Sequence, residues 1–225
     1  MLNVDMHSHT LWSTDSVTTF ETIMALCRKR GIQRLCVTDH NTADGALAFQ
    51  QVAPDLVIVG EEIMTTQGEL LAYFVRESVP QGLTPQETIQ RLRQQGAVIS
   101  VAHPFDRLRK GAWDETDLLA ILDQVDAIEI FNARCVYPED NDKALAFAQQ
   151  HNILGTIGSD AHIRPEYGRA YGVLREFAHD PEDFLDALRQ ADYLKRLSPA
   201  WVHGGSSLAK WSKKVGLRPR LWSGG

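Results

Sequence analysis

Short apolar runs alternate with amphipathic patterns along most of the chain. The apolar runs predict strands at Leu2–Met6, Arg34–Thr38, Leu56–Gly60, Leu70–Val75, Val98–Ala102, Ala127–Phe131, Gly155–Gly158 and Tyr171–Leu174. Between them, charged and apolar residues recur at helical spacing. Strands separated by helices in this way are typical of βα units, so the pattern predicts an α/β fold built on a largely parallel sheet.

Several of the predicted helices carry clear start and stop signals. Thr18 and Glu21 form a capping-box pattern, and Gly31 stands where a glycine often ends a helix. The segment Thr84–Glu87 repeats this pattern with a proline at the first helical position, and Gly96 follows at the end. Further helices are predicted over residues 116–124, over 141–151 and from Asp180 to about Ala191.

The alternation continues without a low-complexity linker or an internal repeat, which predicts one domain over residues 1–203. Composition changes after that point. Residues 204–225 hold five Lys and Arg and no acid, whereas the whole chain has a net charge of −6. We expect a basic C-terminal tail that packs on the barrel or extends from it. The alternative is a binding segment for a phosphate-rich or acidic partner.

Overall composition is that of an ordinary globular protein. With 225 residues and 44% hydrophobic content, the chain can bury a substantial core without disulfides. The negative net charge argues against nucleic-acid binding through bulk positive charge but leaves room for a local basic patch. The three cysteines form no C-x-x-C pair. We found no secretion signal and no long apolar run, so we expect a cytoplasmic protein that does not bind membranes.

The chemistry of the chain is concentrated where predicted strands end. Five of the eight histidines and several acids fall there or in the loop that follows: His7, His9, Asp15, His40, Glu62, His103, Asp160 and His162. In a β/α barrel the carboxyl ends of parallel strands share one mouth. Any one of these histidines could be an ordinary core or surface residue, but the joint pattern predicts a metal site. Imidazoles and carboxylates suit zinc, manganese or iron, and so many donors predict two or three ions with Glu62 bridging.

Five short motifs carry a family resemblance. They are Asp5-Met6-His7-Ser8-His9-Thr10, Thr38-Asp39-His40-Asn41, Gly60-Glu61-Glu62, His103-Pro104 and Ser159-Asp160-Ala161-His162. In order and spacing they resemble the motifs of the PHP (polymerase and histidinol phosphatase) domain family, over about residues 1–174. The resemblance implies a distorted seven-stranded (β/α)7 TIM-like barrel. It also implies metal-dependent hydrolysis of phosphoesters.

The same resemblance implies a distribution of ligands. His7, His9 and Asp160 would hold a first ion, Glu62 would bridge it to a second ion bound by His103, and Asp15, His40 and His162 would hold a third. Many members have a histidine where this chain has Glu69, in Glu69-Leu70-Leu71-Ala72-Tyr73. Glu69 either replaces that ligand, which favours manganese or iron, or caps the hairpin and leaves the second site partly open.

These motifs predict a metal-dependent phosphoesterase in which metal-activated hydroxide attacks phosphorus. Glu62, Asp160 and His162 are the predicted catalytic residues. Arg134, Arg169 and Asn132 are predicted to bind the substrate, and Arg107, Arg109 and Lys110 are weaker candidates. Asp39 is expected to orient a ligand rather than bind metal.

The substrate stays open between a phosphomonoester and a phosphodiester. A nucleotide, a short oligonucleotide and a small metabolite phosphate all fit the motifs. Two alternative functions are an amidohydrolase-like metal hydrolase and a noncatalytic metal-binding PHP module. The sequence lacks a plausible bridging lysine at a strand end, which weighs against the first. Its complete histidine set weighs against the second.

Overall fold

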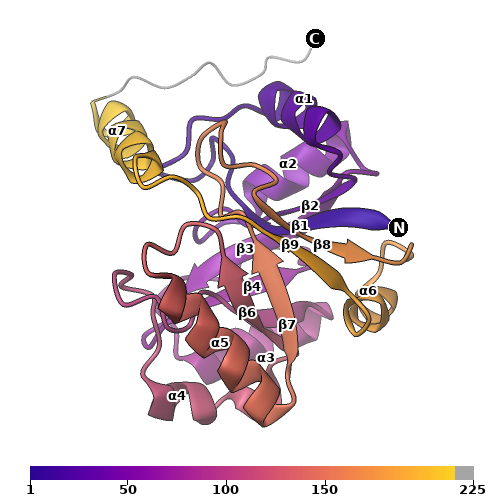
Figure 1. The fold of residues 1–225 in the computed structure, drawn as a ribbon, viewed down its shortest axis with the longest axis vertical. Helices are drawn as coiled ribbons and strands as arrows, with labels where there is room; N and C mark the ends of the chain where they lie inside the picture. Colours follow the sequence, from indigo (N-terminus) through magenta and orange to yellow (C-terminus); the bar gives the residue numbers. More distant parts are fainter. Residues whose placement is uncertain (216–225) are drawn as a thin grey trace.

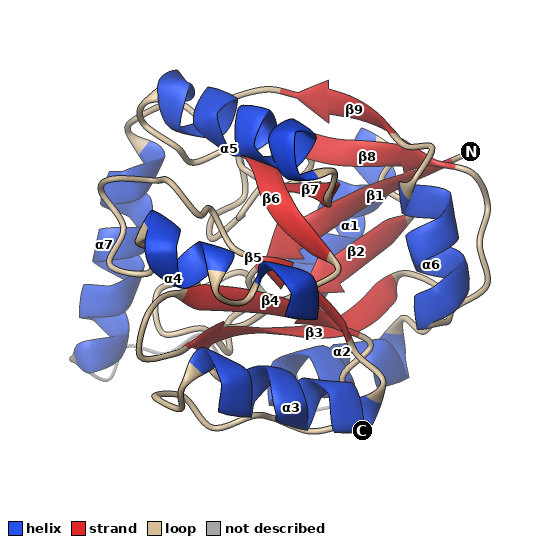
Figure 2. Cartoon of the chain, turned by 90° about the horizontal axis from the view of Figure 1, so that it is seen from below, coloured by secondary structure: helices blue, strands red, loops and turns tan. Residues whose placement is uncertain are grey.

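The computed structural model describes residues 1–215 and shows one nine-stranded sheet surrounded by helices (Figures 1 and 2). The strands are β1 (Leu2–Ser8), β2 (Arg34–Val37), β3 (Val57–Met64), β4 (Glu69–Tyr73), β5 (Val98–Val101), β6 (Ala127–Asn132), β7 (Leu154–Gly158), β8 (Ala170–Leu174) and β9 (Asp192–Lys195). The helices are α1 (Phe20–Arg30), α2 (Asp44–Val52), α3 (Pro85–Gln95), α4 (Glu115–Leu119), α5 (Pro138–His151), α6 (Pro181–Leu188) and α7 (Val202–Lys214), with a 3₁₀ turn at Leu122–Gln124. This turn breaks the helix expected over residues 116–124, and β9 was not predicted.

Strands β1 to β7 form the nearly closed barrel that the sequence predicted. They follow one another in the order β7-β6-β5-β4-β3-β2-β1, and β8 and β9 extend the sheet beyond β1. The chain after β7 then meets β1 again: the amide of Asp160 donates to the carbonyl of His7 at 2.7 Å, and the amide of His9 donates to Ala161 at 2.9 Å. The barrel therefore closes through the backbone of its own sequence motifs.

Strand β4 is antiparallel to both of its neighbours, and so is β8, so the expectation of a largely parallel sheet holds for only part of the sheet. A short turn joins β3 to β4, and the amide of Thr65 donates to the carbonyl of Gly68 at 3.0 Å. Because β4 reverses direction, its first residue, Glu69, pairs with Met64 at the end of β3. Glu69 thus reaches the same end of the barrel as the carboxyl ends of the parallel strands.

A bulge in β1 determines which side chains enter the barrel. Strand alternation would place His7 on the opposite face from Val4 and Met6, which lie in a buried apolar cluster with Ile58. The register between β1 and β2 shifts between Asp5 and Ser8, as one extra residue requires. His7 therefore faces the barrel interior as well, above that apolar cluster.

Helix caps follow the sequence signals in most places. Thr84 and Glu87 form the predicted capping box, and Gly31 and Gly96 end their helices at φ 69° and 76°. Helix α1 differs, because its N-cap is Thr19 rather than Thr18. The hydroxyl of Thr18 instead donates to the carbonyl of His162 at 3.1 Å, which ties the start of α1 to the mouth of the barrel.

The C-terminal segment is helical as far as the structure describes it. Helix α7 begins at Val202, and residues 204–214 of the expected tail belong to it. Arg218 and Arg220 lie outside the described residues. Within residues 1–215, no helix combines the length and the apolar character needed to cross a lipid bilayer.

Candidate metal centre

The mouth of the barrel gathers all nine predicted metal ligands. Strands or the loops after them supply His7, His9, Asp15, His40, Glu62, Glu69, His103, Asp160 and His162. Three overlapping groups have donor atoms within 4.8 Å of one another: His9 with His40 and His162, His7 with His9 and Glu62, and His40 with Glu62 and Glu69. Residues from distant parts of the sequence thus form a single cluster.

Glu62 lies at the middle of this cluster and contacts histidines through both of its oxygens. Its Oε1 is 3.0 Å from Nε2 of His103 and 3.4 Å from Nε2 of His7. Its Oε2 is 2.8 Å from Nδ1 of His40 and 3.4 Å from Nε2 of His9. A carboxylate whose two oxygens face different histidine pairs fits the bridging position between two cations.

Two aspartates complete the cluster from opposite sides. Asp160 places Oδ1 at 3.1 Å from Nε2 of His9, while Arg109 and Asn132 donate to its Oδ2. Asp15 lies in the loop after β1, with Oδ1 3.2 Å from Nε2 of His162 and Oδ2 3.5 Å from Nε2 of His40. Asp15 lies outside the five sequence motifs, and the structure places it in direct contact with two of the predicted ligands.

Glu69 also points into the cluster. Its Oε2 is 3.5 Å from Nε2 of His103, and its Oε1 is 4.0 Å from Nδ1 of His40. The loop carrying Gly111 closes over it, since a Cβ at Gly111 would lie 2.0 Å from Oε2 of Glu69. Of the two alternatives for Glu69, this geometry fits the ligand rather than a hairpin cap.

Buried partners hold two imidazoles, those of His7 and His9, in a fixed orientation. Nδ1 of His7 lies 3.0 Å from Oε1 of Glu129, and Nδ1 of His9 lies 3.0 Å from the hydroxyl of Ser13. That hydroxyl donates to Asp39 at 2.8 Å, so Asp39 acts on His9 through Ser13. With Nδ1 occupied in this way, Nε2 of each ring is left to face the cluster, as in carboxylate–histidine–metal arrangements. Asp39 therefore occupies the supporting position expected of it.

The electrostatics of the cluster show strong compensation between acids and imidazoles. Burial would lower the pKa of His7, yet Asp160, Glu62 and Glu129 together raise it well above its ordinary value. Burial lowers the pKa of His9 well below its ordinary value, and nearby histidines add to the effect. Burial would raise the pKa of Glu62, but His7 and His40 hold it well below its usual range. His7 and His40 therefore favour the ionised form of Glu62.

Several ligand atoms in the cluster lie close to charged neighbours yet form no hydrogen bond, although they are sealed from water. They are Oδ1 of Asp15, Oε2 of Glu62, Nδ1 of His103, Oδ1 of Asp160 and Nε2 of His162. Leaving buried polar atoms unpaired is costly, and such atoms commonly point to an ion or an ordered water. Four of the five face the cluster, and their oxygen and imidazole chemistry matches zinc, manganese or iron. The residues therefore fit divalent cations.

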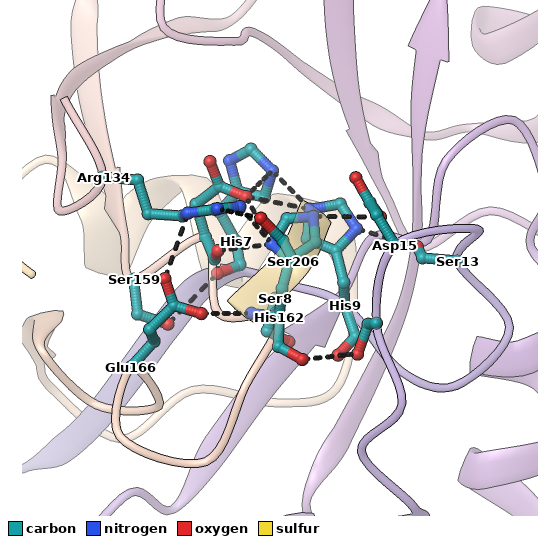
Figure 3. A network of polar contacts seen from close by, with 12 residues as sticks. His7, Ser8, His9, Ser13, Asp15, Arg134, Ser159, His162, Glu166 and Ser206 are labelled. Atoms are coloured by element: carbon teal, nitrogen blue, oxygen red, sulfur yellow. Dashed lines mark hydrogen bonds and ion pairs between the residues drawn. The ribbon is translucent and has the colours of Figure 1, made fainter. Parts of the chain in front are cut away.

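The predicted substrate-binding residues divide into two groups. Asn132 and Arg134 adjoin the cluster: Asn132 donates to Asp160 and Glu129, and Nη1 of Arg134 is 2.7 Å from Nδ1 of His162 (Figure 3). Arg169 does not join them. Its guanidinium donates to the carbonyl of Leu197, and no hydrogen bond or ion pair within residues 1–215 connects it to the cluster.

The weaker arginine candidates also separate. Arg107 pairs with Asp140 on α5 and is turned away from the ligands. Arg109 donates to both Asp160 and Asp106, and it is the guanidinium in direct contact with a predicted metal ligand carboxylate. Of these two candidates, the structure therefore places Arg109 at the cluster and Arg107 away from it.

Two buried glutamates at the site were missed by the sequence analysis. Besides contacting His7, Glu129 accepts from the amide of His103 at 2.8 Å. Glu166 accepts from the amide of His162 at 2.9 Å, and its Oε1 is 3.0 Å from Nε of Arg134. The signal for Glu129 was present, because an acid stands in the middle of the apolar strand Ala127–Asn132. No comparable signal marks Glu166.

Comparisons with known proteins agree with this geometry. The PHP domain model matches residues 5–106, and a model described as PHP-associated matches residues 138–193. The uncharacterized protein MJ0417 of Methanocaldococcus jannaschii is 32% identical over 212 residues, covering 93% of this chain and 86% of that protein.

Two solved structures share the fold at low sequence identity. A two-domain protein from Bacteroides vulgatus that contains a predicted PHP-like metal-dependent phosphoesterase aligns with a TM-score of 0.71 and 17% identity, over 87% of this chain and 65% of its own. A lesion-specific endonuclease from Pyrococcus furiosus aligns with a TM-score of 0.58 and 14% identity, over 85% of this chain and 57% of its own. With its motifs, its barrel and its matching relatives, the chain belongs to the PHP domain family.

Proposed function

We propose that this protein is a metal-dependent phosphoesterase that hydrolyses a phosphomonoester or a phosphodiester. The observation that carries the proposal is the cluster of five imidazoles and four carboxylates at the barrel mouth, in which buried donor atoms lack hydrogen-bond partners. Family membership supports the metal-dependent hydrolase, and the solved phosphoesterase-like neighbours support the phosphoester. The substrate would be a nucleotide, a short oligonucleotide or a small metabolite phosphate.

The cluster would hold two or three ions of manganese, zinc or iron. His7, His9 and Asp160 would hold one, and Glu62 would connect it to a second held by His103 and Glu69. Asp15, His40 and His162 would hold a third. The harder oxygen of Glu69, in place of a histidine, favours manganese or iron at the second position.

The chain's own residues prepare this site for an anionic substrate. Bound divalent cations supply Lewis-acid stabilisation of phosphoryl charge and water of lowered pKa. Glu129 and the Ser13–Asp39 pair keep Nε2 of His7 and of His9 available, because they occupy Nδ1. Asn132 and Arg109 fix Oδ2 of Asp160, so that Oδ1 alone turns toward the imidazoles. Arg134 places a buried cation beside His162, where it could help to orient phosphoryl oxygens.

Adjacent glutamates on β3 provide a matched test. Glu62→Gln removes charge from the centre of the cluster, whereas Glu61→Gln makes the same amino-acid replacement on the other face of the strand, where Glu61 accepts from the amide of Val79. Metal content would be measured on purified protein, and hydrolysis on a panel of a phosphomonoester, a phosphodiester and an amide with manganese, zinc or iron. We expect Glu62→Gln to lose metal and turnover, and Glu61→Gln to keep both.

Three results would contradict the proposal. Turnover of a phosphoester by Glu62→Gln at the rate of the unmodified protein would remove the metal cluster from the reaction. Hydrolysis of the amide alone would favour the amidohydrolase-like alternative. Stoichiometric metal without hydrolysis of any member of the panel would favour a noncatalytic module.

A further inference from the structure

The C-terminal part of the chain differs sharply from the rest in charge and aromatic content. Residues 193–225 contain seven Lys and Arg and no acid, although the whole chain has a net charge of −6. Three of the five tryptophans also fall there, at Trp201, Trp211 and Trp222. The matched PHP-associated segment ends at residue 193, so this composition belongs to a part of the chain outside both family models.

Within the described residues, helix α7 presents most of this character to solvent. Its inward face buries Val202, Ser206 and Ala209. Trp201, the N-cap residue of α7, is 62% exposed, and Trp211 on the helix is 58% exposed. Lys210 and Lys214 are exposed on the same helix. Large exposed aromatic side chains beside basic ones commonly mark a binding surface.

Helix α7 is attached to the metal centre at two points. Near its start, Nη2 of Arg134 donates to the hydroxyl of Ser206 at 2.7 Å, and the same arginine contacts His162 (Figure 3). Near its end, Nζ of Lys213 donates to the carbonyl of Leu11 at 2.6 Å and to that of Ser13, in the loop that follows His9. Helix α7 therefore lies along the rim of the site, and Figure 1 shows it beside the loop that leads to α1.

Tertiary contacts hold this helix in place, since its sequence alone would not. Gly204, Gly205 and two serines lower the helix propensity of its first turns. A Cβ at Gly205 would lie 2.7 Å from Cδ1 of Ile163, the residue after His162. The glycine thus permits close approach of α7 to the chain that carries a predicted ligand, which links the position of the helix to the metal centre.

We propose that α7 is a platform for single-stranded nucleic acid, which it guides into the metal centre. Trp201 and Trp211 would stack on bases, and Lys210 and Lys214 would pair with phosphates. Stacking aromatics interleaved with cations are the chemistry by which proteins hold single strands without reading sequence. The inference rests on the proposed phosphoesterase, and within that function it selects an oligonucleotide over a small metabolite phosphate.

Charge and position favour this occupant over others. The remainder of the chain is acidic and repels a polyanion, so the basic helix is where a strand can approach the mouth. A lipid surface could also accept exposed tryptophans and lysines. However, α7 is attached beside the predicted metal centre, where under the proposed function a phosphodiester chain would serve as both ligand and substrate.

The test measures binding without hydrolysis. Full-length protein is stripped of metal with EDTA and titrated against fluorescein-labelled twelve-nucleotide oligothymidylate and oligouridylate, with fluorescence anisotropy as the readout. The variants are Trp201→Ala/Trp211→Ala and Lys210→Ala/Lys214→Ala. The matched control is Leu119→Ala/Lys29→Ala, which alters an exposed apolar residue and an exposed basic residue on other helices.

We expect the tryptophan pair to weaken binding by about tenfold or more, and the lysine pair to reduce its dependence on salt, while the control binds as the unmodified protein does. Circular dichroism confirms that each variant is folded. Equal binding by all forms overturns the proposal. So does binding only to phosphatidylserine vesicles, or a dimer in sedimentation that the tryptophan variant dissociates. Because the binding assay needs no metal, failure of the phosphoester panel leaves its result interpretable, and the two hypotheses can fail separately.

Discussion

Glu61 offers a quantitative test of the structure through the pH dependence of stability. Its side chain is completely buried, and only Oε2 has a partner, the amide of Val79 at 2.9 Å. Burial, together with the nearby charge of Asp44, raises the pKa of Glu61 from 4.5 to about 8. The substitution Glu61→Gln keeps the shape of the protonated acid and removes its titration.

The sign of the effect follows from proton linkage. Below about pH 4.5 the acid is protonated in both states and contributes no pH dependence. Between that pH and about pH 8 the unfolded chain releases the proton while the folded protein retains it, so the free energy of unfolding falls as the pH rises. Between about pH 5 and about pH 7.5 this loss amounts to roughly 3 kcal/mol, an upper limit because water entry would lower the folded pKa.

Urea unfolding of the metal-free protein at both pH values measures the effect. Other groups that titrate in this range contribute equally to the free energy of unfolding of the unmodified protein and of the variant, so their contributions cancel in the difference. Glu61→Gln should gain up to about 3 kcal/mol relative to the unmodified protein as the pH rises. Glu115→Gln, which alters an exposed glutamate on α4, reports the effect of removing one surface charge. The reasoning fails if the stability difference between Glu61→Gln and the unmodified protein stays the same at both pH values.

Three further predictions concern the mouth of the barrel. In thermal unfolding, Gly158→Ala should destabilise the fold by about 3 kcal/mol, because a Cβ there would lie 2.7 Å from the backbone nitrogen of His7. The control Gly204→Ala, with open space around it, should be neutral or slightly stabilising in the same assay. Glu129→Gln should weaken divalent-cation binding by about 10- to 100-fold in calorimetric titration, and unchanged affinity would show that Glu129 does not orient His7. Manganese at about 100 times its Kd should raise the free energy of unfolding by about 2.7 kcal/mol, and EDTA should reverse the increase; an unchanged melting temperature would contradict binding to the folded state.

Local sequence signals were sufficient to predict which side chains gather at the mouth of the barrel and insufficient to predict their surroundings. Motifs such as His7-Ser8-His9 identify donor residues because metal chemistry restricts the side chains that can serve. The motifs did not indicate the direction of β4, which depends on pairing between strands. The bulge in β1 is likewise a property of two strands together. The family resemblance placed Glu69 at the predicted metal centre. The antiparallel direction of β4 is the physical reason that Glu69 reaches this end of the barrel.

Substrate residues were harder to predict than ligands for a related reason. An arginine on a loop can reach several places, and its contacts depend on neighbours far away in sequence. Arg109 meets Asp160 across the mouth, whereas Arg107, two residues earlier, pairs with Asp140 on α5. Arg169 follows the Asp160 motif closely in sequence, yet its guanidinium bonds to Leu197. A position close to a motif along the chain therefore does not by itself place an arginine at the cluster.

The closure of the barrel connects its stability to the site. The seam between β1 and the end of β7 consists of backbone hydrogen bonds made by His7, His9, Asp160 and Ala161, and three of these four residues are predicted ligands. Asp160 adopts a positive φ of 50°, a conformation that costs energy outside glycine. Like charges also lie near this seam, since Glu62 of β3 and Asp160 both approach Nε2 of His9. Cations bound at the mouth would offset that repulsion, so metal binding and closure of the barrel would stabilise each other.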